Sequence, residues 1–212
     1  MGLLQRTTNF QYVKLVDGKF FLSSDKEKKT PFDELSGRIS DIGIRTDTYE
    51  GQKVTKIYLI MDSDGEAYNL SFNIDGSYAS TFMTFIKNAD ITRELTLVQV
   101  LKMETKDGQE VKRLSLLIKQ DNDYIKAYYT KDNPRGLPQM VKLTLNGKTV
   151  WDRTEVILFF QDIINNELRP LVKKVATINE PPTPKHVASD LSEVNEREVV
   201  SLDDTDDLDL PF

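Results

Sequence analysis

Apolar and polar residues alternate along short stretches of the chain up to about residue 150, and tight turns separate these stretches. The alternation is cleanest between residues 66 and 74, where Leu70, Phe72 and Ile74 share one face of an extended chain. Five pairs that separate such stretches favour hairpin turns, because glycine tolerates positive φ: Asp17-Gly18, Glu50-Gly51, Asp64-Gly65, Asp107-Gly108 and Asn146-Gly147. We therefore predict strands at residues 10–16, 19–23, 37–46, 54–61, 66–74, 95–103, 111–119, 124–130, 141–145 and 149–151.

Two other stretches have apolar residues at helical spacing. Residues 77–88 form the first, and residues 153–168 form the second. We expect the second helix to stop before Pro170, because proline lacks an amide hydrogen and its ring collides with the preceding turn of a helix.

The order of these elements predicts the fold class. Three strands, a helix and two more strands between about residues 37 and 119 follow the order of an OB-fold barrel. We predict a mainly β protein with two helices: an OB-fold-like, five-stranded antiparallel barrel with extra strands and a C-terminal helix, over residues 1–177. The alternative is a generic antiparallel sheet with a packed helix.

The character of the chain changes in residues 178–212, which begin with a proline-rich stretch and continue as an acidic tail. The whole chain has 28 basic and 34 acidic residues, a formal charge of −6. Ten of the acidic residues and two of the basic ones lie in residues 178–212, which leaves +2 on residues 1–177. The apolar residues of this segment are few and scattered, and their burial cannot offset the entropy lost when the chain is ordered. We therefore predict a disordered tail.

The end of this tail carries the most informative motif. Its residues are Asp206, Asp207, Leu208, Asp209, Leu210, Pro211 and Phe212. An acidic cluster followed by an aliphatic residue, proline and a terminal phenylalanine resembles the tip of bacterial single-stranded-DNA-binding proteins, commonly Asp-Asp-Asp-Ile-Pro-Phe. Several phage proteins of this class have similar tails. Leu210 stands where the tip has Ile, and Leu208 interrupts the acidic run. The close resemblance covers residues 203–212.

The resemblance implies a function and its partners. We expect a protein without catalytic activity or cofactor that binds and protects single-stranded DNA during replication, recombination or repair. It would act in the cytoplasm of a bacterial cell, whether the cell or a phage encodes it. Its tip would recruit polymerase-, helicase-, primase- or recombinase-type proteins. A terminal aromatic ring beside a free carboxylate suits an apolar pocket with a basic rim. The pattern leaves self-association open.

Single-stranded DNA is bound by aromatic rings that stack on bases and by cations that contact the backbone. In the strand predicted at residues 124–130, alternation places Tyr124, Lys126 and Tyr128 on one face. The other candidate DNA-binding residues are Lys56, Tyr58, Arg113, Lys119, Trp151 and Arg153. The alternative for each tyrosine is partial burial, and for Trp151 it is packing in the core.

Two other function classes stay open at this point. The first is a metal-dependent DNA-processing enzyme, for which Asp41, Asp47 and Asp62 are candidate magnesium ligands. The second is an adaptor that docks through the tip without binding DNA. The chain has no cysteine, which excludes disulfides and thiolate zinc sites, and its single histidine, His186, lies in the proline-rich stretch. No segment has the roughly 18 apolar residues of a membrane span, so we expect no membrane association.

Overall fold

The computed structural model describes residues 10–25, 27–28, 30–106, 109–145 and 148–179. The chain divides into two units, residues 1–180 and 181–212. Of the predicted acidic tail, residues 178–212, only residues 178 and 179 are described, as the end of a helix. The rest of the tail, including its six tip residues, lies outside the described residues.

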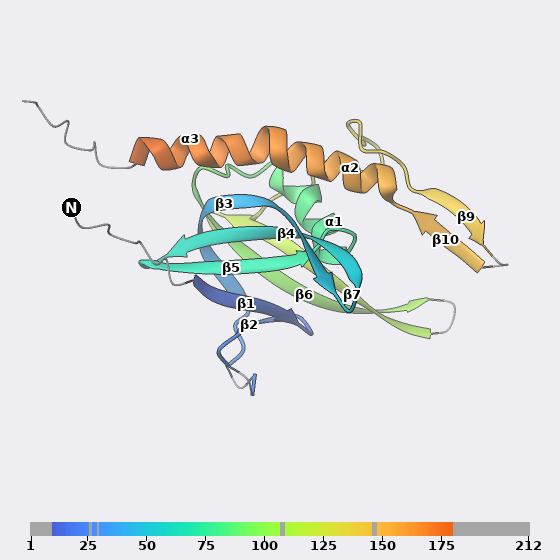
Figure 1. The fold of residues 1–212 in the computed structure, drawn as a ribbon, viewed down its shortest axis with the longest axis horizontal. Helices are drawn as coiled ribbons and strands as arrows, with labels where there is room; N and C mark the ends of the chain where they lie inside the picture. Colours follow the sequence, from blue (N-terminus) through green and yellow to red (C-terminus); the bar gives the residue numbers. More distant parts are fainter. Residues whose placement is uncertain (1–9, 26, 29, 107–108, 146–147, 180–212) are drawn as a thin grey trace, which may run out of the picture. The chain divides into compact units, whose positions relative to one another are not determined.

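The first unit is mainly β, as predicted (Figure 1). Its elements are β1 (Phe10–Val16), β2 (Lys19–Leu22), β3 (Glu34–Tyr49), β4 (Gln52–Ser63), β5 (Glu66–Asn73), α1 (Ser77–Ile86), β6 (Glu94–Lys106), β7 (Gln109–Gln120), β8 (Asp123–Tyr124), β9 (Val141–Leu145), β10 (Lys148–Asp152), α2 (Thr154–Ile163), the π-helical turn η1 (Ile164–Leu168) and α3 (Arg169–Asn179). No helix in this described part is long and apolar enough to cross a membrane.

Eight strands form one open, mixed sheet in the order β2-β1-β5-β4-β3-β6-β7-β8. Neighbouring strands are antiparallel except β1 and β5, which run parallel. The predicted closed barrel is not confirmed, because no pairing between β5 and β7 occurs among the described residues. On its free edge β5 pairs with β1, and β7 pairs with β8 at its end.

The β1–β2 hairpin and α1 occupy the place where the two halves of the curved sheet would otherwise meet. At the hairpin turn, a Cβ placed on Gly18 would lie 2.8 Å from the Cβ of Leu101 in β6, and Lys112 of β7 forms an ion pair with Asp17 at 3.4 Å. On the edge of β7, the N–H of Leu116 donates to the hydroxyl oxygen of Thr81 in α1 at 2.8 Å. A backbone group on the free edge of β7 thus finds its hydrogen-bond partner in a helix rather than in a strand.

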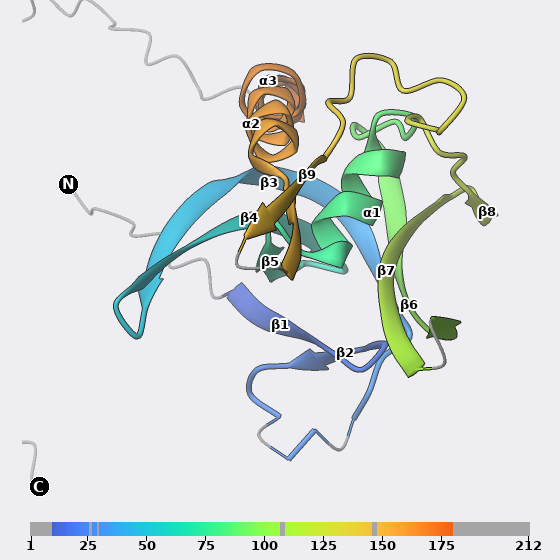
Figure 2. The same ribbon diagram turned by 90° about the vertical axis from the view of Figure 1, so that its right-hand side faces the viewer.

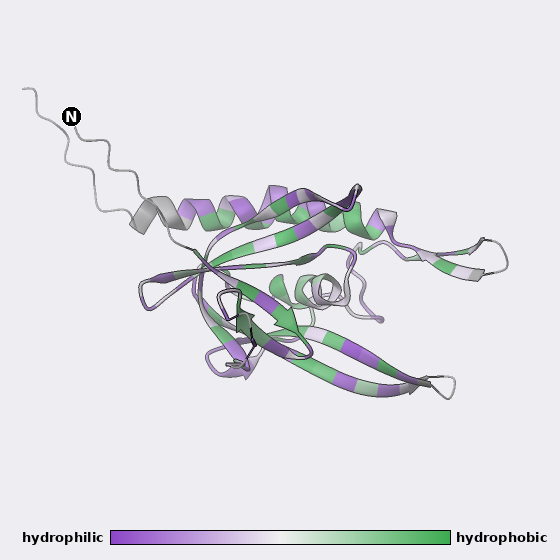
Figure 3. Ribbon diagram, turned by 60° about the horizontal axis from the view of Figure 1, so that its bottom comes forward, coloured by the Kyte–Doolittle hydropathy of each residue, from purple (hydrophilic) through white to green (hydrophobic). Residues whose placement is uncertain are grey.

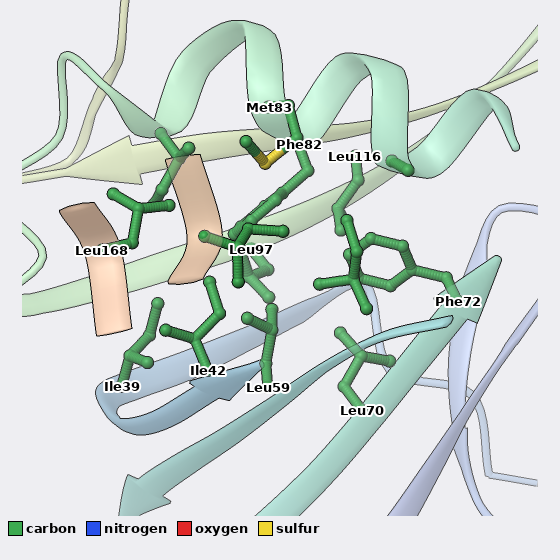
Figure 4. Close-up of a cluster of buried hydrophobic side chains, with 14 of the residues drawn as sticks. Ile39, Ile42, Leu59, Leu70, Phe72, Phe82, Met83, Leu97, Leu116 and Leu168 are labelled. Atoms are coloured by element: carbon green, nitrogen blue, oxygen red, sulfur yellow. The ribbon is translucent and has the colours of Figure 1, made fainter. Parts of the chain in front are cut away.

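The core lies between the sheet and the helices (Figure 4). Helix α1 contributes Phe82 and Met83, which are fully buried against Leu59 and Leu97 of the sheet. The alternation read from the sequence is visible along the strands, where apolar and polar positions succeed each other (Figure 3). Burial of such large apolar side chains contributes about 1.5–3 kcal/mol each.

The C-terminal helix is longer than predicted. The prediction that it stops before Pro170 is wrong, because α3 continues through this residue to Asn179. The π-helical turn η1 immediately precedes it, and the N–H of Arg169 donates to the carbonyl of Ile164, five residues back. This wider turn accommodates the proline ring and the missing hydrogen bond that would break a regular α-helix.

The prediction of a strand at residues 124–130 is also wrong, except at its first residue. Strand β8 ends at Tyr124, and the chain then leaves the sheet. The N–H of Ile125 still donates to Ile118 of β7 at 2.9 Å, but the N–H of Tyr128 donates to the carbonyl of Thr84 in α1 at 2.7 Å. The apolar residues of this segment therefore cover α1 instead of extending the sheet.

Candidate nucleic-acid interface

The residues from 124 to 151 are the most basic part of the folded unit. They contain five basic residues and one acidic residue, Asp132, a formal charge of +4. Residues 1–177 together carry +2, so the rest of residues 1–177 carries −2. The segment runs from β8 past α1 to the β9–β10 hairpin (Figure 2). We call the exposed surface of this segment the 124–151 surface.

Four cations of this surface are free to meet an external anion. They are exposed and form no ion pair with any residue that the structure describes: Lys126, Lys131, Arg135 and Lys142. A cation that is already paired must lose its partner before it can bind a phosphate. Unpaired cations bind phosphate and release counterions without that cost.

Tyr124 lies at one end of the surface. Its side chain is 55% exposed, and the ammonium of Lys119 lies 5.0 Å from the centre of its ring. Lys119 also pairs with Glu34, and this hydrogen bond raises the pKa of the Lys119 ammonium. The exposed ring is accessible for stacking, and the cation beside it is held in place.

Tyr128 is packed more tightly and has two cations near its ring. The guanidinium of Arg135 lies 4.1 Å from the ring centre, and the ammonium of Lys87 lies 5.7 Å from it. Arg135 has φ of 49° and is followed by Gly136 with φ of 81°, a left-handed turn in the loop that carries the guanidinium. Because Arg135 occupies a face of Tyr128, a base would stack on the guanidinium plane, which arginine permits.

The neighbouring residues separate into inward and outward groups although the segment is not a strand. Tyr129 is buried in the core, and this burial raises its pKa to about 12. Ile125 packs against the core as well, whereas the side chain of Lys126 is exposed. The carbonyl of Lys126 accepts a hydrogen bond from the side-chain amide of Asn88 at 2.9 Å, which fixes the backbone beside α1.

Trp151 lies at the other end of the surface and is 54% exposed, so it is not a core residue. It stands opposite Lys142 across the hairpin and lines a cleft of about 370 Å³ together with Pro138 and Met140. A second cleft of about 360 Å³ shares Pro138 and Leu137 with the first and extends to Lys131. The two clefts connect Trp151 to the loop that carries Arg135.

The remaining sequence-predicted residues lie elsewhere and are engaged. Lys56 pairs with Asp47 at 3.1 Å on the β3–β4 hairpin. Arg113 pairs with Glu104 at 3.2 Å on the β6–β7 hairpin. Arg153 donates to the carbonyl of Asp75 and the hydroxyl of Ser80, which joins the start of α2 to the start of α1.

Tyr58 is the clearest case of a predicted stacking residue that is occupied by the protein itself. Its side chain lies against Gly43, where a Cβ would approach the hydroxyl oxygen to 2.5 Å and the ring carbons to 2.7 Å. Its hydroxyl donates to Asp41 and accepts from Arg169, both at 3.1 Å. Burial, followed by the charge of Asp41, raises the pKa of Tyr58. Arg169 at the start of α3 thus contacts Tyr58 on this face of the sheet.

Sequence reasoning missed Lys131, Arg135 and Lys142. A charge count in a moving window would have found them, because the window from 124 to 151 holds five cations and one acid. The three aspartates considered for magnesium have separate partners: Asp41 contacts Arg169, Asp47 contacts Lys56, and Asp62 accepts from Ser40. Within the described ranges, no three His, Asp or Glu side chains gather closely enough to hold a metal ion.

Comparison with known proteins returns no relative: no family model, no curated protein and no solved structure matches this chain.

Proposed function

We propose that the protein binds and protects single-stranded DNA through the 124–151 surface and recruits replication or repair proteins through its acidic C-terminal tip. The observation that carries the proposal is the combination of exposed aromatic rings with unpaired cations along one segment. Tyr124 and Trp151 lie toward its two ends, with Arg135 stacked on Tyr128 between them. Single-stranded nucleic acid is bound by this combination of stacking and backbone contacts, largely without regard to sequence.

The preference for single strands follows from the aromatic contacts. A ring can stack on a base only where that base is not already stacked inside a duplex, whereas a cation contacts phosphates of either form. We therefore expect the cations to supply salt-dependent affinity and the rings to supply the discrimination against duplex DNA.

The strand order supports an OB-fold ancestry for the sheet. We infer that β3, β4, β5, β6 and β7 are the five strands of an OB-fold, because their order β5-β4-β3-β6-β7, with α1 between β5 and β6, matches that of the fold. In this interpretation β1 has taken the edge of β5 that would close the barrel. OB-folds usually bind on their second and third strands, here β4 and β5. The engagement of Tyr58 by Arg169 favours the 124–151 surface instead.

The tip motif supports recruitment, and it rests on the sequence of residues 206–212 alone. Phe212 would insert into an apolar pocket, its carboxylate would meet a basic rim, and the aspartates would accelerate encounter with a basic partner. An adaptor without DNA affinity would use the same tip. DNA binding by the intact chain therefore decides between the two functions.

The test uses two double variants that remove the same charge from different places. Lys126→Gln with Lys131→Gln changes the 124–151 surface, and Lys53→Gln with Lys102→Gln changes exposed, unpaired lysines of β4 and β6. We expect the first pair to weaken binding to labelled oligo-dT and to reduce the salt slope by about 0.7 for each lost phosphate contact. The second pair should behave as wild type.

Two results would contradict the proposal. Equal weakening by both pairs would mean that net charge alone attracts DNA, and equal affinity for duplex and single strands at moderate salt would mean that the rings do not contribute. The same titration repeated with magnesium, followed by gel analysis of the oligonucleotide, tests for the nuclease alternative through cleavage products.

A further inference from the structure

The β9–β10 hairpin is a separate sheet of only two strands. An isolated pair of strands is marginally stable in water, and an unpaired strand edge is a template for pairing with another chain. No strand in the described part of the protein pairs with the outer edge of β10. Part of the hairpin already belongs to the 124–151 surface, but this outer edge has no assigned role.

The register of the hairpin identifies which backbone groups point to that edge. Leu145 and Lys148 are direct partners, and so are Leu143 and Val150. In an antiparallel pair, hydrogen-bonded and non-hydrogen-bonded partners alternate, and the partners that flank a two-residue connection are hydrogen-bonded. The amide and carbonyl of Val150 therefore face β9, whereas those of Thr149 and Trp151 face outward. Neither residue has another backbone hydrogen bond within the described ranges.

The side chains of β10 leave this edge unprotected. Val150, at the centre of the strand, is 45% exposed, and Leu143 beside it is also exposed. Proteins usually guard an open edge with charged residues. The outer edge of β7 is guarded in this way by the consecutive residues Lys112 and Arg113. The centre of β10, Thr149-Val150-Trp151, has no charge.

We propose that the outer edge of β10 pairs in antiparallel fashion with β10 of a second copy of this chain, centred on Val150. In this register Thr149 of one copy lies opposite Trp151 of the other, and the two residues exchange their outward N–H and C=O groups. The two valines form a non-hydrogen-bonded pair, the kind whose side chains approach more closely. The groups of β10 that already bond to β9 and the groups that would bond to the second copy are therefore different, so each hairpin can keep its own hydrogen bonds when the strands pair around Val150.

A two-fold axis at Val150 makes the pairing symmetric, and it places the backbone of position 148 of each copy opposite Asp152 of the other. An interface of this kind uses the same patch on both subunits, as closed dimers do. The joined ribbon has four strands, and it carries Trp151 and Lys142 of both copies on one face, opposite to the valines.

The pairing itself does not depend on DNA, so it is tested without DNA. The chain contains no cysteine, and Val111 in β7 is 45% exposed, the same as Val150. Full-length Val150→Cys and Val111→Cys are oxidised mildly and analysed on non-reducing gels. We expect a disulfide-linked dimer for Val150→Cys, because directly opposed residues have Cα separations that a disulfide can bridge, and we expect Val111→Cys to stay monomeric.

Sedimentation of the unmodified chain gives the second measurement. We expect a concentration-dependent dimer that is lost in Val150→Lys, where two like charges meet at the axis, and kept in Val111→Lys. A wild-type chain that stays monomeric at all concentrations would overturn the proposal, as would equal cross-linking of the two cysteine variants. If Val150→Lys fails to fold, the cross-linking result alone decides, because Val150→Cys introduces no charge.

Discussion

Replacing Tyr124 by alanine separates a stacking residue from a structural one. The ring is 55% exposed and lies at the end of the short strand β8, so its removal opens no cavity in the core. The structure describes one ring contact of Tyr124, with the Lys119 ammonium, which lies 5.0 Å from the ring centre. A cation–π contact at an exposed site contributes about 0.5–1 kcal/mol, so we expect the variant to remain folded with little loss of stability.

The expected effect on DNA binding is larger than the effect on folding. Loss of one base stack costs about 1–3 kcal/mol, which corresponds to a roughly 5- to 150-fold weaker affinity for oligo-dT. Lys119 remains paired with Glu34 in the variant, so its charge stays in place and the salt slope should not change. A weaker affinity with an unchanged salt slope is therefore the signature of a lost stack, distinct from a lost phosphate contact.

The matched control is Tyr12→Ala, because Tyr12 is 54% exposed on β1, outside residues 124–151. Affinity is measured by fluorescence anisotropy with labelled oligo-dT at several salt concentrations, and folding by thermal unfolding of each variant. If Tyr124→Ala binds as tightly as wild type, or if Tyr12→Ala weakens binding to the same extent, the 124–151 surface is not where the bases stack.

Three further predictions concern the tail and a buried tyrosine. Truncation after Glu180 changes the formal charge from −6 to +1, so oligo-dT binding should be equal or tighter, most clearly at low salt, and loss of binding would contradict this. Deletion of Phe212 should weaken capture of host replication or repair proteins at least about tenfold through lost aromatic burial, while DNA affinity stays unchanged; equal capture would reduce the tail to an electrostatic role. Burial raises the pKa of Tyr129 to about 12 from the ordinary 10.0, so the folded state retains this proton more tightly than the unfolded state. The corresponding stability should be complete below pH 10 and be lost as pH rises through 12, and denaturant unfolding of Tyr129→Phe should lack this component.

The parts of the fold that the sequence predicted well are those fixed by local geometry. The hairpins at Asp17-Gly18, Glu50-Gly51 and Asp64-Gly65 form as expected, and all six of these residues have positive φ. The alternation within β4 and β5 also matches the buried positions. Turn chemistry and side-chain alternation act over a few residues, so the sequence carries them directly.

The parts that could not be predicted depend on contacts between distant segments. The edge of β5 pairs with β1, which lies more than fifty residues earlier, and no local pattern distinguishes this partner from β7. Pro170 is accommodated by the π-helical turn before it, which sequence periodicity does not reveal. The segment after Tyr124 alternates like a strand, but α1 offers Thr84 as a backbone partner and removes the segment from the sheet.

The same reasoning explains which of the predicted DNA-binding residues are exposed and which are engaged within the protein. Tyr124 and Lys126 were identified from their alternation with Ile125 and Tyr129, and the structure keeps that inward and outward division in another conformation. The sequence does not distinguish Tyr58 from these two residues, because the hydrogen bond from Arg169 to Tyr58 joins residues more than a hundred positions apart. Exposure of an aromatic ring is a property of the tertiary structure, whereas local charge density can be read from the sequence.

The location of the unpaired cations is itself a consequence of the fold. On adjacent strands the register brings acidic side chains within reach of basic ones, as for Lys56 with Asp47 and Arg113 with Glu104. Among the described side chains of the eight-stranded sheet, the unpaired cations are scattered one to a strand: Lys14 in β1, Arg38 in β3, Lys53 in β4 and Lys102 in β6. Between residues 126 and 140 the chain pairs with no strand, so Lys126, Lys131 and Arg135 keep their charge available. We therefore expect this loop, which is held against a rigid sheet and helix, to bind a polyanion.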